Sequence, residues 1–334
     1  MKYFIERLIS GVDLSDTDIK QTFEEIMSGN VSDVQTGALL VALRAKRETP
    51  SEIASAASFM RSKALNIDLG FDVVDTCGTG GDNSSTFNIS TAVAFVLAGA
   101  GLKVAKHGNR AVSSPSGSAD CLEALGVSID LGPKEAADAI KKNGFAFLFA
   151  PKYHPSMKHA MPARRQLGIR TIFNVLGPLA NPANASYQVV GVYSRDLIKP
   201  VAQALFLMGL KGAMVVSAGI MADALDEASI AGTTYYARLN NGQVTFGEIR
   251  PEDAGITPGP IESIKSSSPK ESANIIEGVF EGRLRGPYLD IILLNAAAGF
   301  MAVDGTIDIK EGMNMASEVI TKGAAIDALN RARA

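Results

Sequence analysis

Phe71-Asp72-Val73-Val74-Asp75-Thr76-Cys77-Gly78-Thr79-Gly80-Gly81-Asp82 is a short apolar run that leads into a glycine-rich turn. Glycine lets the backbone adopt positive φ and lets a ligand approach without meeting a Cβ. Successive N–H groups in such a turn form a concave site for an anion. Asn88-Ile89-Ser90-Thr91 then begins the apolar run Ala92–Ala98, which predicts a helix whose N-terminus favours a phosphate. Strand, turn and helix together predict an α/β unit that binds a ligand with more than one phosphate.

The spacing of the glycines distinguishes this turn from two common phosphate-binding motifs. A dinucleotide fingerprint requires glycine at position 83, where this chain has Asn83, and no Gly-Lys dipeptide completes a P-loop. For the turn taken alone, an ordinary glycine-rich loop after a strand remains the alternative. The second anion-binding feature, at Asn88–Thr91, favours a phosphate or pyrophosphate site.

A cationic, hydroxyl-rich segment follows the predicted strand Lys103–Ala105. It runs from Lys106 to Ser118 and contains two cations, an imidazole, an amide and several hydroxyls. Lys and Arg next to small donors suit phosphate oxygens, although a solvated surface loop has a similar composition. Ser118 stands at the N-cap position expected for a short helix over residues 119–126.

Two further groups of side chains suit the partners of a phosphorylated substrate. Asp226 and Glu227 are adjacent carboxylates after a predicted strand over residues 213–216. Such pairs are usually only solvated, but beside a pyrophosphate they suit Mg²⁺, which takes one or two carboxylates and shares the phosphates of the ligand. Arg164 and Arg165 project about 100° apart on a helix, so only one can serve a given pocket. An arginine fork suits a carboxylate, and a surface arginine pair is the alternative.

The pattern of apolar residues predicts an α/β protein with two parts. Residues 1–66 indicate helices only, and from Phe71 short apolar strands alternate with helices, which is typical of a mainly parallel sheet covered on both faces. We therefore expect a small all-helical N-terminal domain over residues 1–66, completed by part of 160–182. A large α/β domain then covers residues 70–334.

The predicted strands place the candidate residues at one edge of the sheet. Asn240-Asn241-Gly242 predicts a hairpin turn, and two or three helices, including Pro287–Val303, are expected to close the chain. Ligands of open α/β sheets bind beyond the carboxyl ends of the strands. The predicted strands are Val73–Val74, Lys103–Ala105, Phe145–Phe149, Gln188–Tyr193 and Ala213–Val216, followed by the hairpin Tyr235–Leu239 and Val244–Phe246.

Composition excludes several classes of protein and identifies none. The 334 residues are 46% hydrophobic and 20% charged, as in an ordinary globular chain, and the net charge of −3 offers nothing to nucleic acid or an anionic membrane. Cys77 and Cys121 are too few for a disulfide framework or a metal cluster. Without a predicted signal peptide or membrane span, the expected location is the cytoplasm.

The combined motifs resemble the anthranilate phosphoribosyltransferase family of tryptophan biosynthesis, over essentially the whole chain and in the order of that family. Any one of these motifs is weak, whereas their combination is highly specific. The motifs are Asp75–Asp82, Asn88–Thr91, Lys106–Ser114, Pro151–Pro155, Arg164–Gly168, Thr171–Pro182 and Leu225–Glu227.

The resemblance implies a glycosyltransferase of the nucleoside phosphorylase and phosphoribosyltransferase type of fold, with its site between the two domains. It would use Mg²⁺ to transfer phosphoribosyl from 5-phosphoribosyl 1-pyrophosphate to the amine of anthranilate, as a homodimer formed through the helical domain. Lys106 and Arg164 would be catalytic. Anthranilate would bind at Gly78, Asn109, Arg164 and His154, and the metal at Ser90, Asp226 and Glu227. Phosphoribosyl pyrophosphate would bind at Gly78, Gly80, Gly81, Asp82, Thr86, Asn88, Ser90, Thr91, Lys106, His107, Gly108, Asn109, Ser114 and Ser118.

One departure from the family and two alternative functions follow from the same residues. The run Ser217–Ala224 replaces a shorter stretch that contains His and Gly in the family, and Asp223 adds a further carboxylate there. A pyrimidine nucleoside phosphorylase shares the architecture, but its glycine loop has a Lys-His-Ser lead-in where this chain has Asp75-Thr76-Cys77. A non-catalytic relative that binds nucleic acid would need a basic stripe, which the net charge of −3 disfavours.

Overall fold

The chain begins with a bundle of four helices. The computed structural model describes residues 1–82, 84–111, 115–219 and 225–334. Three of the four helices begin at capping boxes, in which a Ser or Thr hydroxyl and a side chain three residues later bond each other's backbone N–H. The helices are α1 (Lys2–Ile9), α2 (Asp16–Met27), α3 (Asp33–Lys46) and α4 (Pro50–Lys63).

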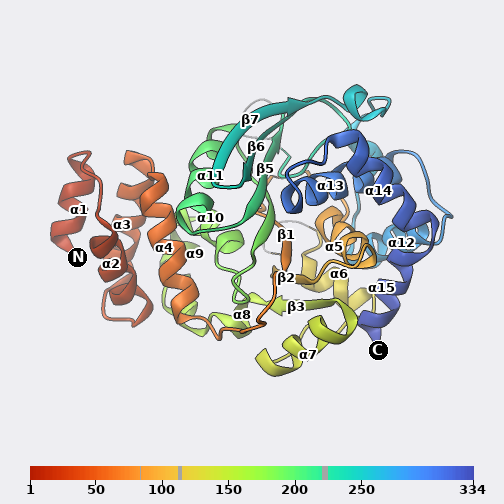
Figure 1. Cartoon of the computed structure of the whole chain (residues 1–334). Coiled ribbons are helices and arrows are strands. Elements are labelled where there is room, and N and C mark those ends of the chain that lie inside the picture. The colour runs from red at the N-terminus through yellow and green to blue at the C-terminus, as the bar shows by residue number, and fades with distance from the viewer. Residues whose placement is uncertain (83, 112–114, 220–224) are drawn as a thin grey trace.

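A seven-stranded sheet forms the centre of the larger part, with the order β3-β2-β1-β4-β5-β6-β7 (Figure 1). The first five strands along the chain run parallel, and the last two form an antiparallel hairpin at one edge. Its strands are β1 (Val74–Gly78), β2 (Val104–Gly108), β3 (Phe145–Phe149), β4 (Tyr187–Gly191), β5 (Gly212–Ala218), β6 (Thr234–Asn240) and β7 (Gln243–Ile249).

The strand order determines where a ligand can bind. From β1 the chain moves outward through β2 to β3, and it then returns to place β4 on the other side of β1. The order therefore reverses between β1 and β4, and the crevice beyond the carboxyl ends of two such strands is the usual ligand site of an open α/β sheet. Gly78 and Gly191 are the last residues of these strands and are paired with each other.

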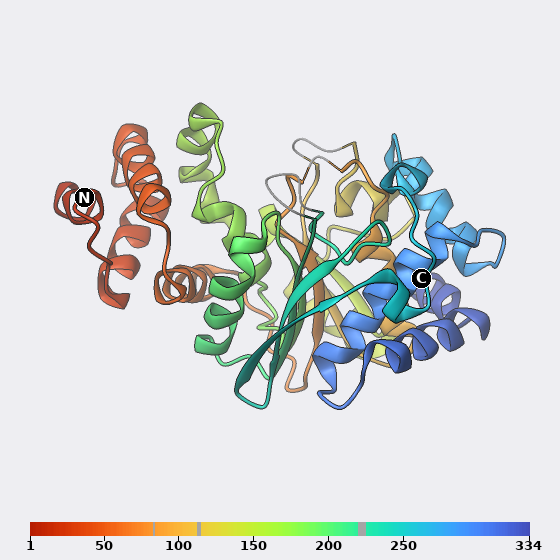
Figure 2. The ribbon, with the colours of Figure 1, turned by 90° about the horizontal axis from the view of Figure 1, so that it is seen from above.

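Helices cover both faces of the sheet (Figure 2). One face carries α5 (Ile89–Gly99), α6 (Ser118–Ala124), α12 (Pro269–Phe280), α13 (Pro287–Val303), α14 (Ile309–Thr321) and α15 (Ala324–Arg333). The other face carries α7 (Pro133–Asn143), α10 (Ile172–Leu179) and α11 (Ile198–Leu207). Short connections are α8 (Ala150–Tyr153), η1 (Pro155–His159), α9 (Met161–Leu167), η2 (Arg195–Leu197), η3 (Pro251–Ala254) and η4 (Ile261–Ile264).

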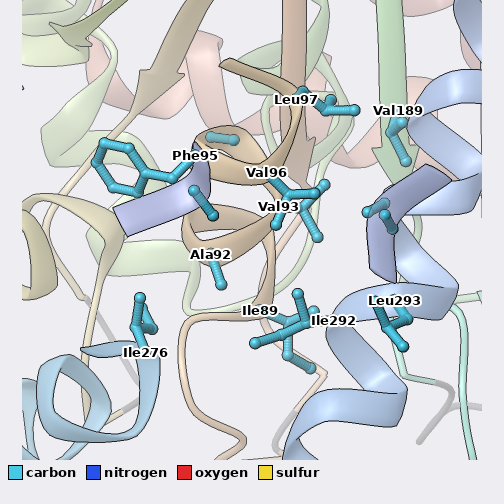
Figure 3. Close-up of a cluster of buried hydrophobic side chains, with 14 of the residues drawn as sticks. Ile89, Ala92, Val93, Phe95, Val96, Leu97, Val189, Ile276, Ile292 and Leu293 are labelled. Atoms are coloured by element: carbon cyan, nitrogen blue, oxygen red, sulfur yellow. The ribbon is translucent and has the colours of Figure 1, made fainter. Parts of the chain in front are cut away.

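Helix α5 is buried on all sides, which fixes the position of its N-terminus. Its side chains from Ala92 to Ala98 are at most 3% exposed, and the helix packs between the sheet and helices α13, α14 and α15. Ile276 of α12 and Ile292 of α13 lie in one apolar cluster with these side chains (Figure 3). Because α5 is held on every side, the first turn beginning at Ile89 is a rigid support for side chains at the edge of the sheet.

The helical bundle shares one apolar core with the helices on the nearer face of the sheet. Phe23 of α2 lies 5.6 Å from Phe173 of α10, measured between ring centroids, and also contacts Phe59 of α4. The same cluster continues through α11 to the inner residues of β4, β5 and β6. The segment that contains α9 and α10 therefore packs against both the bundle and the sheet.

The predicted fold class is confirmed, with three differences in detail. Strands β1 and β2 extend to Gly78 and Gly108, so Lys106 belongs to a strand and not to the expected loop. Ser118 is the first residue of α6 rather than its N-cap, which is Gly117. Four α-helices, not two or three, close the described part of the chain. Within that part, the structure offers no helix of the length and apolarity that crossing a membrane requires.

Candidate active site

Lys106 is a buried cation on β2, the second strand from one edge of the sheet, and is only 1% exposed. Its ammonium donates to the carbonyl oxygen of Thr76 on β1 and, over 3.2 Å, to the hydroxyl of Ser90 on α5. Burial lowers the pKa of Lys106, and the nearby Asp75 carboxylate opposes that shift. The lysine thus lies between the first turn of α5 and the carboxyl end of β1, where an anionic ligand would offset the cost of its burial.

Asp75 and Asn181 support β2 from the opposite face of the sheet. One Asp75 oxygen accepts from the backbone N–H of His107 at 3.1 Å, and the other accepts from the Asn181 amide at 2.8 Å. The same amide donates to the carbonyl of Ala105. Both side chains are fully buried, and their bonds hold the backbone on either side of Lys106 in place.

The glycine turn folds back over the ends of β1 and β4. Gly80 and Gly81 have φ of +64° and +74°, a conformation that other residues rarely adopt. The N–H of Thr79 donates to the carbonyl of Gly191, and the N–H of Gly80 donates to Asp226 Oδ2 over 2.7 Å. The N–H groups of Gly81 and Asp82 have no acceptor among the described residues, so these two remain to bind an anion.

Asp226 occupies a gap between two glycines on neighbouring strands. A Cβ added to Gly78 would lie 2.3 Å from Asp226 Oδ2, and one added to Gly191 would lie 1.5 Å from the Asp226 backbone oxygen. Leu225 pairs with Ala218 at the end of β5 and thereby directs Asp226 into this gap. Glycine at both strand ends is therefore required for the acidic segment to reach the crevice.

Three carboxylates gather here without a matching number of cations. Burial raises the pKa of Asp226 to about 7, with a further contribution from the neighbouring Asp82. Burial and then Asp226 raise the pKa of Glu227 well above its ordinary value, against the opposing effect of Lys106. In the described part of the chain, no group of three or more His, Cys, Asp or Glu residues forms a metal site by itself. The repulsion that raises both pKa values is relieved when a divalent cation binds.

The first turn of α5 lies beside the acidic pair. The backbone N–H of Ser90 opposes the raised pKa of Glu227, and the N–H of Thr91 donates to the carbonyl of Asn88. The Asn88 side chain accepts from the hydroxyls of Ser116 and Ser272. The Ser90 hydroxyl is thus the group of this turn that lies toward Lys106, whereas Thr91 is fully buried.

Ion pairs tie the first described residues after β2 to helix α6. Arg110 bonds Asp120 and Glu123 of α6, so it is not free to bind phosphate. The carbonyl of Asn109 accepts from the Ser118 hydroxyl over 3.2 Å, while the Asn109 side chain is turned toward its own neighbour. Among the other candidates, Gly108 packs against Ser118, Thr86 pairs with Lys265, and Ser114 lies outside the described residues, as does Asp223.

Arg164 and His154, two of the residues expected to bind an aromatic acid, lie on the side of the sheet that faces the helical bundle. Arg164 on α9 lies with its guanidinium carbon 5.1 Å from the centroid of the Phe173 ring, and its pKa is lowered by burial. No ion pair of the described residues includes Arg164. Arg165 is exposed. A half-buried guanidinium without a carboxylate partner is suited to an anionic ligand.

Comparison with known proteins shows the family to which this chain belongs. Residues 70–326 match the family model described as "Glycosyl transferase family, a/b domain", and residues 2–64 match the helical bundle domain of the same family. A curated anthranilate phosphoribosyltransferase of Persephonella marina is 45% identical over 100% of this chain and 98% of its own length. One from Herpetosiphon aurantiacus is 47% identical over 96% of this chain and 94% of its own. The chain belongs to the anthranilate phosphoribosyltransferase family.

Solved structures of family members have the same fold. The Thermus thermophilus anthranilate phosphoribosyltransferase is 39% identical, has a TM-score of 0.92, and covers 99% of this chain and 98% of its own. The Saccharomyces cerevisiae enzyme, solved with phosphoribosyl pyrophosphate and Mg, is 31% identical with a TM-score of 0.89, over 98% of this chain and 95% of its own. The same yeast enzyme has been solved with 4-fluoroanthranilate.

The two histidines predicted to touch substrates are buried against each other. The rings of His107 and His154 lie 5.2 Å apart, and neither Nε2 has a hydrogen-bond partner among the described residues. Burial lowers the pKa of His107 to about 3 and that of His154 to about 4, so both are neutral near pH 7. The third histidine, His159, packs against Gly29 just after the end of α2 and therefore has a structural role.

Replacing His107 by Asn should flatten the pH dependence of stability. Unfolding restores an ordinary pKa near 6.5, so the unfolded chain gains protons below that pH that the folded chain does not bind. His107 therefore contributes stability above pH 6.5 that is lost as pH falls toward 3. Between pH 7 and 5, the wild type should lose about 2 kcal/mol more free energy of unfolding than His107→Asn.

Urea unfolding of both proteins at several pH values measures this difference. The raised pKa of Asp226 has the opposite effect on the pH dependence of stability. Because Asp226 is present in both proteins, its contribution cancels in the comparison. Parallel pH curves for the two proteins would contradict a neutral, buried His107.

The sequence patterns did not reveal three residues that build the site. Gly191 admits Asp226, Asn181 supports β2, and Arg170 donates to the carbonyl of Gly81. Gly191 has no local signature, because its partner lies far away in the sequence, and Asn181 stands in the motif Thr171–Pro182 without a pattern that indicates its contact with β2. Arg170 lies beyond Gly168, which ends α9 with φ of +60°, and is therefore not on the helix that carries Arg164.

Proposed function

We propose that this protein transfers the phosphoribosyl group of 5-phosphoribosyl 1-pyrophosphate to the amine of anthranilate. The products are N-(5-phosphoribosyl)anthranilate and pyrophosphate, a step of tryptophan biosynthesis. The observation that carries the proposal is the meeting of Lys106, the glycine turn and the Asp226–Glu227 pair at the carboxyl ends of β1, β2 and β4. Family membership supports this transferase over a pyrimidine nucleoside phosphorylase or a nucleic-acid-binding relative.

The chemical demand of this reaction is the charge that grows on the leaving pyrophosphate. As the bond from the anomeric carbon to oxygen lengthens, the sugar becomes cationic and the leaving group anionic. The free N–H groups of Gly81 and Asp82 and the ammonium of Lys106 are positioned to bind that group before the bond breaks. Fixed donors of this kind stabilise the transition state without reorganising during the reaction.

The carboxylates fit a magnesium ion bound together with the pyrophosphate. Burial raises the pKa values of Asp226 and Glu227, with further contributions from Asp82 on Asp226 and from Asp226 on Glu227, and the Ser90 hydroxyl lies on the adjacent turn. Mg²⁺ commonly takes few protein ligands and completes its shell with water and phosphate oxygens. The absence of a group of three or more such ligands among the described residues agrees with that arrangement. When bound, the ion would neutralise charge on the leaving group.

Anthranilate would bind through its carboxylate to Arg164, with Asn109 and Gly78 at the same acceptor site. The amine of anthranilate is aromatic and uncharged near neutral pH, so attack on the anomeric carbon requires no strong base. His107 and His154 are neutral, so they bind by shape and hydrogen bonding rather than by charge. Holding both substrates in register supplies the remaining acceleration.

Three further features of the protein belong to this proposal. We propose a domain boundary between residues 66 and 70, with part of 160–182 completing the helical domain. We also propose a homodimer formed through the helical domain, because Tyr3, Ile9 and Val34 expose apolar side chains on or next to α1 and α3. A cytoplasmic location agrees with the two free cysteines of the described residues.

The first experiment follows anthranilate fluorescence in purified protein with phosphoribosyl pyrophosphate and Mg²⁺. We expect a time-dependent loss of signal that a chelator abolishes and added Mg²⁺ restores. An absence of turnover with any divalent metal would overturn the proposal. Phosphorolysis of pyrimidine nucleosides by the same sample would then favour the phosphorylase alternative.

Replacing Arg164 by Ala should separate the two substrates kinetically. Loss of the guanidinium removes a charged hydrogen bond to the anthranilate carboxylate, which is worth about 2 kcal/mol or about 30-fold in KM. The KM for phosphoribosyl pyrophosphate should change little, because Arg164 lies on the bundle side of the sheet. Arg165→Ala is the matched control, since Arg165 is adjacent and exposed. Equal increases in both KM values would contradict the assignment.

A further inference from the structure

Arg170 is a cation at the junction of the bundle and the glycine turn. It is half-buried in the connection between α9 and α10, and no ion pair of the described residues includes it. Its guanidinium carbon lies 4.1 Å from the centroid of the Tyr193 ring, and Nη2 donates to the carbonyl of Gly81. One side chain therefore stacks through its face and donates through its edge.

The bond from Arg170 to Gly81 holds the second half of the glycine turn, which the hydrogen bonds of Thr79 and Gly80 do not fix. Thr79 is fixed to β4, because its N–H donates to Gly191 and its hydroxyl accepts from the N–H of Tyr193. Gly80 is fixed by Asp226. For the carbonyl of Gly81, the bond from Arg170 is the one that the described residues provide.

The carbonyl of Gly81 and the N–H of Asp82 belong to the same peptide plane. In a trans peptide these two groups point in opposite directions, so the guanidinium that draws the carbonyl toward itself turns the Asp82 N–H away. That N–H has no acceptor among the described residues. The Asp82 carboxyl, in turn, lies beside Asp226 and raises its pKa. Arg170 thus sets the direction of an anion-binding donor and the placement of a carboxylate.

Arg170 is itself held from the bundle side. Its backbone carbonyl accepts from a guanidinium nitrogen of Arg44 on α3, and the connection that contains it continues from α9, where Arg164 lies. A continuous set of contacts therefore runs from the bundle through Arg170 to the glycine turn.

We propose that Arg170 is a positioning residue that orients the Gly81–Asp82 peptide for the pyrophosphate group of the substrate. The inference rests on the proposed function, because it assigns the leaving group to this turn. Arginine is required because a planar guanidinium can stack and donate at once, whereas the ammonium of lysine keeps the charge and loses the stacked plane. Arg170 need not touch the substrate to act.

Three substitutions separate positioning from charge and from folding. Arg170→Ala should raise the KM for phosphoribosyl pyrophosphate by about 10-fold or more, in the range for one misplaced charged hydrogen bond, with less than a twofold change for anthranilate. Arg170→Lys should recover little of this loss. Tyr193→Ala should give a smaller loss of the same kind, because it removes the ring that holds the guanidinium.

Two matched controls should behave as the wild type. Tyr193→Phe keeps the ring, and Arg165→Ala removes an exposed cation from the neighbouring helix α9. Calorimetric titration with phosphoribosyl pyrophosphate should show the weaker binding of Arg170→Ala directly, at an unchanged melting temperature. If that variant does not fold, Arg170→Lys and Tyr193→Ala provide the same comparison.

The outcomes distinguish this inference from the function on which it rests. Wild-type turnover with an unchanged KM for phosphoribosyl pyrophosphate in Arg170→Ala would overturn the positioning role and leave the function standing. Full recovery in Arg170→Lys would also overturn it, since charge alone would then suffice. If the wild type does not turn over, the calorimetric comparison still decides whether Arg170 shapes the anion site.

Discussion

Replacing Asp226 by Asn should lower kcat/KM for phosphoribosyl pyrophosphate by about 1,000-fold, the range for loss of a preorganised electrostatic partner, while raising the melting temperature of the metal-free protein. The two effects have one cause. Asp226 has its pKa raised to about 7 by burial and by Asp82, so at pH 8 the folded protein holds a charge that the surroundings disfavour. Asparagine removes that charge and can still accept from the N–H of Gly80.

The direction of the stability change follows from the raised pKa. The unfolded carboxyl ionises near pH 4 without penalty, so folding becomes less favourable as pH rises from that value toward the folded pKa of about 7. Asp226→Asn is free of this loss. Adding Mg²⁺ with pyrophosphate should stabilise the wild type and leave the variant nearly unchanged, because the ion binds the folded carboxylates.

Thermal unfolding with and without Mg²⁺ and pyrophosphate, together with steady-state kinetics, measures both effects. Asp130→Asn is a suitable control, because its side chain is 84% exposed and forms an ion pair with Lys152 at the surface. Glu227→Gln should behave like Asp226→Asn. An Asp226→Asn variant with wild-type kinetics and an intact response to Mg²⁺ would show that the metal binds elsewhere.

Replacing Lys106 by Met should reduce kcat by about 100-fold to 1,000-fold, the effect expected when one preorganised donor is removed from a developing charge. Methionine fills a similar volume, so the substitution isolates the ammonium. Lys106 also opposes the raised pKa of Glu227. Without the cation that pKa rises further, and the activity that depends on the ionised form should shift to higher pH.

Kinetics between pH 6 and 9 test both consequences in one series. Lys103→Met serves as the control, because Lys103 comes just before the same strand and donates to a surface carbonyl, that of Lys141. Lys106→Arg should not restore activity, since a fully packed position cannot accept the larger planar group. Loss of activity without any change in the pH profile would show that Lys106 does not control the ionisation of Glu227.

Local sequence was sufficient to predict the parts of the site that local geometry controls. The glycine spacing and the apolar run predict the turn that ends at Asp82 and the helix after Asn88, and both are present, although Asp75–Gly78 belongs to β1 and not to the turn. The same local reasoning misplaced Lys106, because lysine in a polar run is typical of a loop. It lies within a strand because Asp75 and Asn181, from distant segments, satisfy the polar groups around it.

The parts that sequence could not predict depend on contacts between distant segments. Nothing near Gly191 indicates that its missing side chain makes room for the Asp226 backbone. Arg110 was expected in a phosphate-binding loop, but it pairs with Asp120 and Glu123, whose positions depend on α6. Arg170 acquires its place from Tyr193 and from the turn at Gly81.

The position of Asp226 between Gly78 and Gly191 has a consequence for the order of folding. These two glycines are adjacent only after β1 and β4 have paired, and those strands are separated by more than one hundred residues and by the whole of β2 and β3. Contacts of such long range form late, because closing the intervening chain costs entropy before it returns any energy. The repelling carboxylates are therefore brought together only after β1 and β4 have paired, so the capacity to bind a metal arises late in folding.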